Sequence, residues 1–204
     1  MKKAPASSQH RLRGGFSLME MLVVMAVVTI LLSLAGNGMR TTWRSQQIYT
    51  SATSLMQAFS LARSNAVRYN VPVQVRIYRF QDGDLSSADP QYRAYQVVSV
   101  KAGQDQDQFN EVSELQRFEG TTIMSKFPQY SSLVTGDTKM PNSSDYSYVA
   151  VEFRPDGSTN LETSPAQPWT ITLVADWGAD DASKLAKDAR TLVISPDTGV
   201  VSLY

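Results

Sequence analysis

One uninterrupted apolar run constrains this chain more than any other feature of its sequence. Residues 16–35 read FSLMEMLVVMAVVTILLSLA and contain a single charged side chain, Glu20. A helix rises about 1.5 Å per residue, so a run of this length spans roughly 30 Å, the thickness of one hydrocarbon core. The run predicts a transmembrane helix over 16–35, and the domain that follows has to fold from the remaining residues.

The charges on the two sides of this run are unequal, although the whole chain has 19 basic and 19 acidic residues. Lys2, Lys3, Arg11 and Arg13 precede the run without any acid, so residues 1–15 carry +4 and the remainder carries −4 by side chains. A basic flank ahead of an apolar span predicts a cytoplasmic N-terminus. We therefore expect a single-pass protein whose C-terminal domain lies outside the inner membrane.

Three interpretations of the apolar run remain open at this point. The first interpretation is an ordinary secretory signal peptide, because residues 33–35 (SLA) offer a small-x-small cleavage pattern ahead of Gly36. The second is a plain single-pass anchor. The third interpretation explains Glu20, since a carboxylate inside an apolar span is costly unless it is paired. A cut between Gly15 and Phe16 would create an α-amino group four residues before Glu20, and the two charges would neutralise each other.

The junction itself carries a family resemblance. Residues 13–22 (RGGFSLMEML) resemble the class III signal of type IV pilins and pseudopilins, which has glycine before the cut, phenylalanine after it and glutamate as the fifth mature residue. The resemblance implies that a prepilin peptidase removes residues 1–15 as a leader peptide and that Phe16 is N-methylated. It also implies that Glu20 pairs with an N-terminal amine during filament assembly.

The composition disfavours most enzyme chemistry. The chain has no cysteine, and its one histidine is His10. Disulfides, thiolate metal sites, cysteine nucleophiles and multi-histidine metal sites are therefore excluded. Asp82, Asp84 and Asp89 are reminiscent of a calcium loop, but the twelfth position is Arg93 rather than an acid. We expect a protein that is not an enzyme and holds no cofactor and no metal.

A second helical pattern follows the apolar run. Gly36 and Gly38 mark either a helix end or a weak point within a longer helix, which the resemblance to pilins favours. Beyond them, one apolar stripe recurs at spacings of four and three and consists of Ile48, Ala52, Leu55, Phe59, Ala62 and Ala66. This stripe predicts an amphipathic helix over 36–70 that packs on a sheet and ends near Tyr69. Trp43 and Arg44 lie where such a helix leaves the bilayer and are expected to be an interfacial anchor.

The remainder, 71–204, is predicted to be β-rich. Residues 71–78 alternate between apolar and polar and indicate a half-buried strand, with a partner at 92–100 across a long loop. Further strands are predicted near 121–124, at 146–153, 169–177, 191–195 and 200–204, while 102–112 and 128–146 are expected to be loop. One long helix followed by six or seven strands gives an α+β fold with one antiparallel sheet domain.

This order of elements sharpens the resemblance. Residues 61–73 (LARSNAVRYNVPV), 153–158 (FRPDGS) and 194–200 (ISPDTGV) look like minor pseudopilins of the GspH/FimT type. The second of these segments is also similar to the Verru_Chthon cassette protein D family. The resemblance implies a structural subunit of a type II secretion or type IV pilus-like filament. Its partners would be the inner membrane, a prepilin peptidase and other pilin or pseudopilin subunits in a hetero-oligomeric filament.

Two other functions stay open. The chain is alternatively a membrane-tethered module that recognises an exported protein or DNA through loops 81–91 and 128–146, or a secreted enzyme released at Gly36. Basic side chains near the helix–strand junction would form the DNA-binding patch: Arg63, Arg68, Arg76 and Arg79. The charge of −4 after the leader disfavours nucleic acid as a partner.

Overall fold

The computed structural model describes residues 17–81, 89–100, 109–136, 138–139, 146–164, 167–176 and 182–204. The chain divides into two compact units, Met1–Thr41 and Thr42–Tyr204. The division falls inside the long helix α1 (Leu18–Tyr69), so this helix contributes to both units. Each unit is described separately below.

Helix α1 continues through Gly36 and Gly38. The interpretation of this position as a helix end is therefore wrong. The predicted C-terminal end is confirmed, because α1 stops at Tyr69 and Asn70 adopts a left-handed conformation with φ of 54°. Asparagine is one of the few residues that accept this conformation at the end of a helix. The turn leads directly into the first strand.

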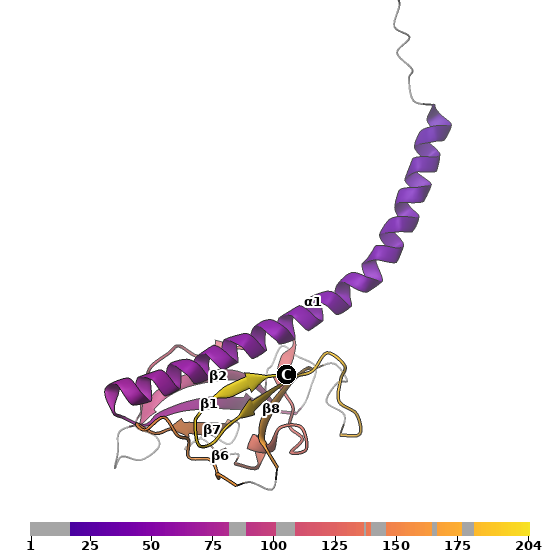
Figure 1. Ribbon diagram of the computed structural model, residues 1–204. Helices are drawn as coiled ribbons and strands as arrows, with labels where there is room; N and C mark the ends of the chain where they lie inside the picture. Colours follow the sequence, from indigo (N-terminus) through magenta and orange to yellow (C-terminus); the bar gives the residue numbers. More distant parts are fainter. Residues whose placement is uncertain are drawn as a thin grey trace, which may run out of the picture. The chain divides into compact units, whose positions relative to one another are not determined.

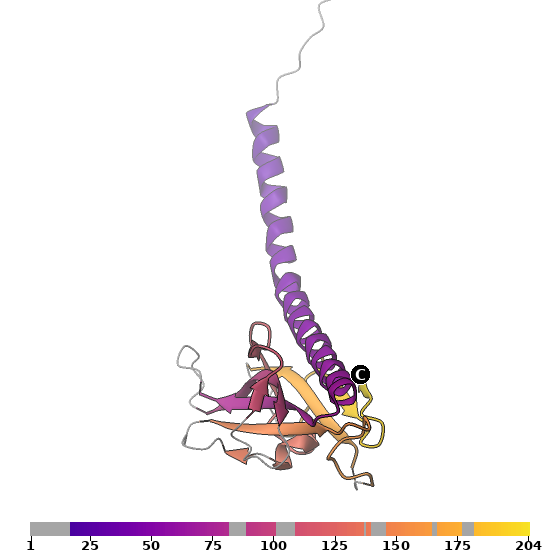
Figure 2. The same cartoon turned by 90° about the vertical axis from the view of Figure 1, so that its left-hand side faces the viewer.

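Residues 42–69 of α1 run along one face of the sheet in the second unit (Figures 1 and 2). All six residues of the predicted stripe are at most 1% exposed, and they form the main core together with one face of the sheet. The predicted packing of this helix on a sheet is therefore confirmed. Three of the six are alanines, which allow the helix backbone to approach the strands closely.

The described residues contain ten strands and one short 3₁₀ helix, η1 (Ser132–Gly136). The strands are β1 (Val73–Phe80), β2 (Gln91–Val100), β3 (Phe109–Glu111), β4 (Gln116–Arg117), β5 (Thr122–Met124), β6 (Thr138–Lys139), β7 (Ser147–Phe153), β8 (Trp169–Ala175), β9 (Arg190–Ile194) and β10 (Val201–Leu203).

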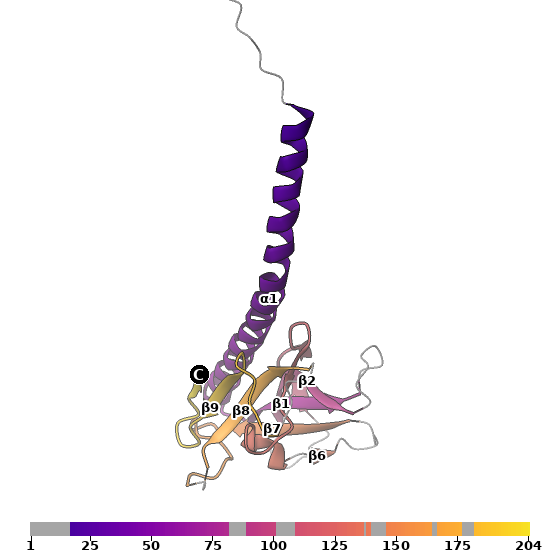
Figure 3. The ribbon, with the colours of Figure 1, turned by 90° about the vertical axis from the view of Figure 1, so that its right-hand side faces the viewer.

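These strands form one antiparallel sheet in the order β10-β9-β8-β5-β2-β1-β7-β6, and β3 and β4 also pair with β2. Strands β8 and β9 lie beside each other on one side of the sheet, and β1 and β7 on the other (Figure 3). The predicted α+β fold, a long helix packed on an antiparallel sheet, is confirmed. The predicted hairpin of the first two strands is also confirmed, with Val73 opposite Ser99 and Phe80 opposite Gln91.

Two expectations about the strands need correction. Strands β3, β4 and β6 were not expected; β3 and β6 fall within segments expected to be loop, and each of the three has only two or three residues. In addition, β1 is not half-buried, because seven of its eight residues are buried and both faces of the strand are covered. Its second face belongs to a smaller cluster that contains Tyr78, Phe80, Ala94 and Tyr148.

We expect replacement of a stripe residue to destabilise the second unit strongly. Leu55→Ala removes a side chain that is 0% exposed and should lower the free energy of unfolding by about 3 kcal/mol. Leu61→Ala is the matched control on the same helix, because Leu61 is 44% exposed, and it should change stability by less than about 0.5 kcal/mol. Denaturant unfolding of the full chain in detergent, followed by circular dichroism, measures both. Equal effects of the two variants would contradict the assigned packing face.

Candidate assembly interface

The first turns of α1 expose an apolar surface on every side. Between Leu18 and Leu32, twelve large apolar side chains are exposed: Leu18, Met19, Met21, Leu22, Val23, Val24, Met25, Val27, Val28, Ile30, Leu31 and Leu32. A helix that is apolar all round is not stable in water and belongs in a membrane or among other helices. This surface is the candidate assembly interface.

Glu20 is the charged residue of this surface, and it lies in the first turn of α1. Its side chain is exposed, and among the described residues none forms an ion pair or hydrogen bond with its carboxylate. The positive end of the helix dipole favours a carboxylate at this position. Gly15 and Phe16, the predicted processing residues, lie outside the described residues, so the geometry between Phe16 and Glu20 stays a prediction.

Ser17 has a structural role at the start of α1 that the resemblance to the class III signal does not indicate. Its hydroxyl accepts a hydrogen bond from the Met19 N–H at 3.3 Å, and its carbonyl accepts one from the Glu20 N–H at 3.0 Å. Ser17 is therefore the N-cap of α1. The Ser-x-x-Glu spacing of residues 17–20 is the signal of a capping box and would have located it.

The two other polar side chains of this surface need no external partner. The Thr29 hydroxyl donates to the carbonyls of Met25 and Ala26 at 2.7 and 2.9 Å, and the Ser33 hydroxyl donates to the Ile30 carbonyl at 2.9 Å. Such bonds along the helix satisfy hydroxyl groups in apolar surroundings. Glu20 thus differs from Thr29 and Ser33, because its carboxylate has no hydrogen-bond partner among the described residues.

The predicted interfacial anchor lies just beyond the boundary between the two units. Trp43 is 64% exposed, and Arg44 is partly buried. An indole ring in this state is available to a membrane surface or to another subunit. The anchoring role of the two residues stays a prediction.

The four arginines of the alternative DNA-binding patch do not share one surface. Arg63 and Arg68 are exposed on α1, but Arg76 is only 1% exposed. The Arg76 guanidinium donates through Nε to Gln74 Oε1 at 3.0 Å and stacks 4.7 Å from the centre of the Tyr148 ring. Burial raises the pKa of neighbouring Tyr78 above its ordinary value, and Arg76 opposes part of that rise. Arg76 therefore belongs to the interior of the domain.

The aspartates considered for a calcium loop are not brought together in the described residues. Asp82 and Asp84 lie outside the described residues, and Asp89 pairs with Lys126 at 3.6 Å. Asp176 forms a nearly buried ion pair with Arg93, which joins β2 to the end of β8. Across the described part of the chain, no three acidic or histidine side chains lie close enough together to hold a metal ion.

The family described as Type II transport protein GspH matches residues 51–198. The chain belongs to this family. The Prokaryotic N-terminal methylation motif matches residues 10–36, a range that contains Gly15, Phe16 and Glu20. The predicted resemblance to minor pseudopilins of the GspH/FimT type is confirmed, whereas similarity to the Verru_Chthon cassette protein D family stays a prediction.

Two crystal structures of the type IV minor pilin FimU of Pseudomonas aeruginosa (strain PAO1) are similar to this chain. The structure in space group P21 is 14% identical and has a TM-score of 0.44, and the match covers 78% of this chain and 89% of that one. For the structure in space group P65 the identity is 15%, the TM-score 0.38, and the coverage 76% and 91%. No curated protein matches the chain.

Membership in the GspH family makes the chain a structural subunit of the pseudopilin and pilin class, and the family implies assembly with other pilin subunits. The members of this class are not known as enzymes. The methylation motif and the family indicate attachment to the membrane by the N-terminal helix. Among the residues that the structure describes, no helix is long and apolar enough to cross a membrane.

The buried position of Arg76 leads to a stability prediction. Arg76→Met should lower the free energy of unfolding by about 3 kcal/mol, because it leaves the Gln74 carbonyl without its buried donor. Arg68→Met removes an exposed arginine and should change stability by less than about 0.5 kcal/mol. Thermal and denaturant unfolding of the two variants distinguish an interior arginine from a surface one, and a stable Arg76→Met protein would contradict the interior role.

Proposed function

We propose that this chain is a minor subunit of a type II secretion or type IV pilus-like filament, assembled through its N-terminal helix. A prepilin peptidase would cut after Gly15, and Phe16 would be N-methylated. Residues 16–35 would cross the inner membrane with the N-terminus in the cytoplasm, and the sheet domain would face the periplasm. The observation that carries this proposal is the exposed apolar surface of residues 18–33 with Glu20 as its charged residue.

The electrostatics of the helix start support a pairing of Glu20 with an N-terminal amine. Glu20 lies four residues after Phe16, which corresponds to about 6 Å along a helix axis. In an apolar environment an isolated carboxylate and an isolated ammonium are both costly, whereas together they are neutral. N-methylation keeps the positive charge of the amine, so it preserves the pairing.

The helix dipole suggests which of the two charges depends more on a neighbouring subunit. The positive end of α1 stabilises the Glu20 carboxylate but destabilises an ammonium group at Phe16. The amine therefore gains more from a second carboxylate than Glu20 gains from a second amine. We infer that the Phe16 amine of an incoming subunit forms an ion pair with the Glu20 carboxylate of a subunit already in the filament. This ion pair would set the axial register between the two subunits.

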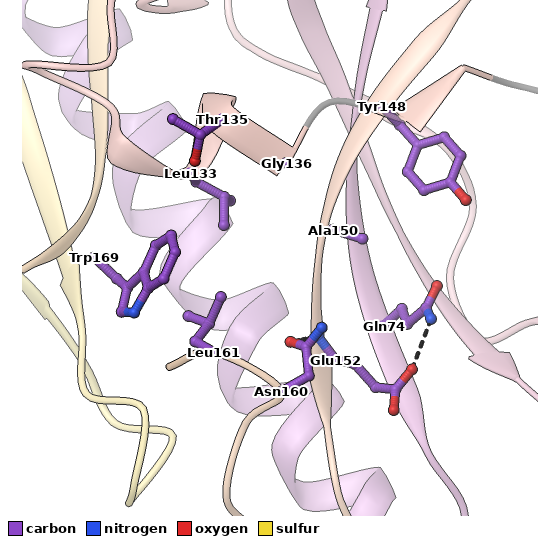
Figure 4. A pocket seen from close by; sticks show the side chains of 10 residues that line it. All are labelled: Gln74, Leu133, Thr135, Gly136, Tyr148, Ala150, Glu152, Asn160, Leu161 and Trp169. Atoms are coloured by element: carbon purple, nitrogen blue, oxygen red, sulfur yellow. Dashed lines mark hydrogen bonds between the residues drawn. The ribbon is translucent and has the colours of Figure 1, made fainter. Parts of the chain in front are cut away.

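The runner-up is a membrane-tethered binding module that uses loops 81–91 and 128–146. Residues 132–136 of the second loop form η1, and Leu133, Thr135 and Gly136 of this helix line a cavity on the sheet domain (Figure 4), which favours binding at that loop. A DNA-binding variant of this function loses support because Arg76 is buried. Binding and filament assembly use different parts of the chain and are compatible.

Processing gives the first prediction of this proposal. The protein extracted from bacterial membranes should start at N-methylated Phe16, as measured by intact mass and N-terminal peptide analysis. Gly15→Val should block the cut, because the residue before it has to be small, whereas Ala35→Leu should leave processing unchanged. A protein that begins at Gly36, with cleavage blocked by Ala35→Leu, would establish an ordinary signal peptide and overturn the proposal.

Assembly gives the second prediction. Glu20→Ala should leave the subunit membrane-inserted and processed but reduce its incorporation into filaments by about tenfold or more, because the amine loses its counter-charge. Thr29→Val is the matched control within the same surface, since the Thr29 hydroxyl bonds only to carbonyls of its own helix. Sheared filaments quantified by immunoblotting measure incorporation. Normal incorporation of the Glu20→Ala subunit would refute the pairing mechanism.

A further inference from the structure

Strand β10, yellow in Figure 1, is the last strand on one side of the sheet. It pairs with β9, where the Tyr204 N–H donates to the Thr191 carbonyl at 2.8 Å and the Thr191 N–H donates to the Tyr204 carbonyl at 2.9 Å. Alternate residues of an antiparallel strand direct their main-chain groups to the same neighbour. Ser202 therefore faces β9 as Tyr204 does, whereas the N–H and C=O groups of Val201 and Leu203 point away from β9.

These four main-chain groups have no partner in the part of the chain that the structure describes. No described strand lies beyond β10, and no described side chain is hydrogen-bonded to Val201 or Leu203. Helix α1 cannot pair with this edge, because its own main-chain groups are bonded within the helix. The outer edge of β10 therefore offers the donors and acceptors that a further strand would use.

The turn 154–157 limits this edge at one end. It lies against Gly199, because a Cβ on Gly199 would come within 2.6 Å of the Gly157 carbonyl. From Val200 to Tyr204 the chain extends over about 13 Å, which admits roughly four residues of a second extended chain. A segment that pairs here is therefore short.

A cavity of about 340 Å³ lies between α1 and this edge of the sheet. Seven residues of the second unit line it, four from α1 and three from the start of β10 and the turn before it: Met56, Gln57, Ser60, Arg63, Gly199, Val200 and Val201. Val200 is 49% exposed and leaves apolar surface for an occupant to cover. A chain added to β10 would continue the sheet beside α1 and would place alternate side chains in the cavity.

Arg63 is the charged residue among those that line the cavity. Its Nε donates to the Gly157 carbonyl at 3.4 Å, which holds the guanidinium near the limited end of the edge. Within the described residues, no carboxylate forms an ion pair with Arg63. Asp156 of the same turn instead accepts from the Ser158 hydroxyl and N–H at 2.7 and 2.9 Å, and these bonds lower the pKa of Asp156. Because an occupant that covers an unpaired guanidinium desolvates it, the cavity favours an occupant with an acidic side chain.

We propose that the outer edge of β10 binds a short extended segment of a partner polypeptide, which pairs with Val201 and Leu203 and places an aspartate or glutamate side chain on Arg63. Main-chain hydrogen bonds would provide affinity, and the cavity would select the side chains. The site shares no residue with the candidate assembly interface. A subunit with Glu20→Ala should therefore bind the segment as the unaltered chain does, and failure of either proposal leaves the other standing.

The test is selection from a displayed library of random nine-residue peptides on the full chain in detergent micelles. Selected peptides should carry an aspartate or glutamate at one position, flanked by strand-forming residues. A synthetic peptide of the selected sequence should bind Arg63→Gln about fivefold more weakly, because a charge-assisted contact is lost. Arg68→Gln, the matched control at another exposed arginine of α1, should stay within about twofold of the unaltered chain. Selection without acidic residues, or full binding by Arg63→Gln, would overturn the proposal.

N-methylation of the synthetic peptide tests the strand pairing without altering the protein. Alternate N–H groups of a paired strand point to β10, so methylation of one alternate set should weaken binding more than tenfold. Methylation of the other set removes N–H groups that point away from β10 and should change binding by less than about threefold. Equal effects of the two sets would show that the peptide does not pair as a strand and would overturn the proposal.

A second copy of this chain is the competing occupant. Because the chain has no cysteine, Ser202→Cys places a single thiol on the exposed edge strand. Two copies paired edge to edge would bring these thiols together. Under the proposal, oxidation should give no more disulfide-linked dimer than it gives for Ser64→Cys, a matched exposed position on α1. Dimers in clear excess of that control would identify a second copy as the occupant and overturn the proposal.

Discussion

Burial of the apolar stripe of α1 on the sheet is the contact on which the globular unit depends. The alanines at 52, 62 and 66 bring the helix close to the strands, so that Leu55 and Phe59 reach into the core. Phe59 meets Phe153 edge to face at 6.1 Å, which ties the helix to the last residue of β7. Because Asn70 turns the chain directly into β1, the helix also places the central strand pair β1–β2, and the other strands add on both sides of that pair.

Two parts of helix α1 have residue patterns that suit different surroundings. Residues 48–66 show an apolar stripe with polar residues around it, which suits a helix that lies between a sheet and water. Residues 18–33 are apolar on all sides, and their hydroxyl groups are bonded within the helix. Only the second pattern leaves nothing for water to solvate except Glu20. The change of pattern along α1, rather than any break in the helix, separates the candidate assembly interface from the domain.

The sequence predicted those parts of the fold that local patterns determine. The stripe, the helix end at Tyr69 and seven of the ten strands of the described residues follow from periodicity and turn residues, and the structure contains all of them. Strands β3, β4 and β6 lie in polar segments without apolar alternation, so only their pairing with β2 and β7 makes them strands. Arg76 is a second case in which the local pattern misleads, because it predicts an exposed side chain. Its strand alternates, but the Tyr148 ring that covers it comes from β7, far along the chain.

The two charged residues in apolar surroundings, Arg76 and Glu20, are stabilised in different ways. Arg76 lies inside the domain, where Gln74 accepts a hydrogen bond from its guanidinium and the Tyr148 ring stacks on it. The desolvation of this charge is therefore compensated within the folded subunit. Gln74 in turn donates a hydrogen bond to Glu152. Glu20 lies on an apolar surface with no partner among the described residues, and only the positive end of its helix favours it. A charge whose partners lie within the fold stabilises the single subunit. A charge whose partner comes from another subunit is stabilised only when the subunits assemble. This argument supports the proposed filament role of Glu20 over a simple anchor, because an anchor would be more stable with an apolar residue at position 20.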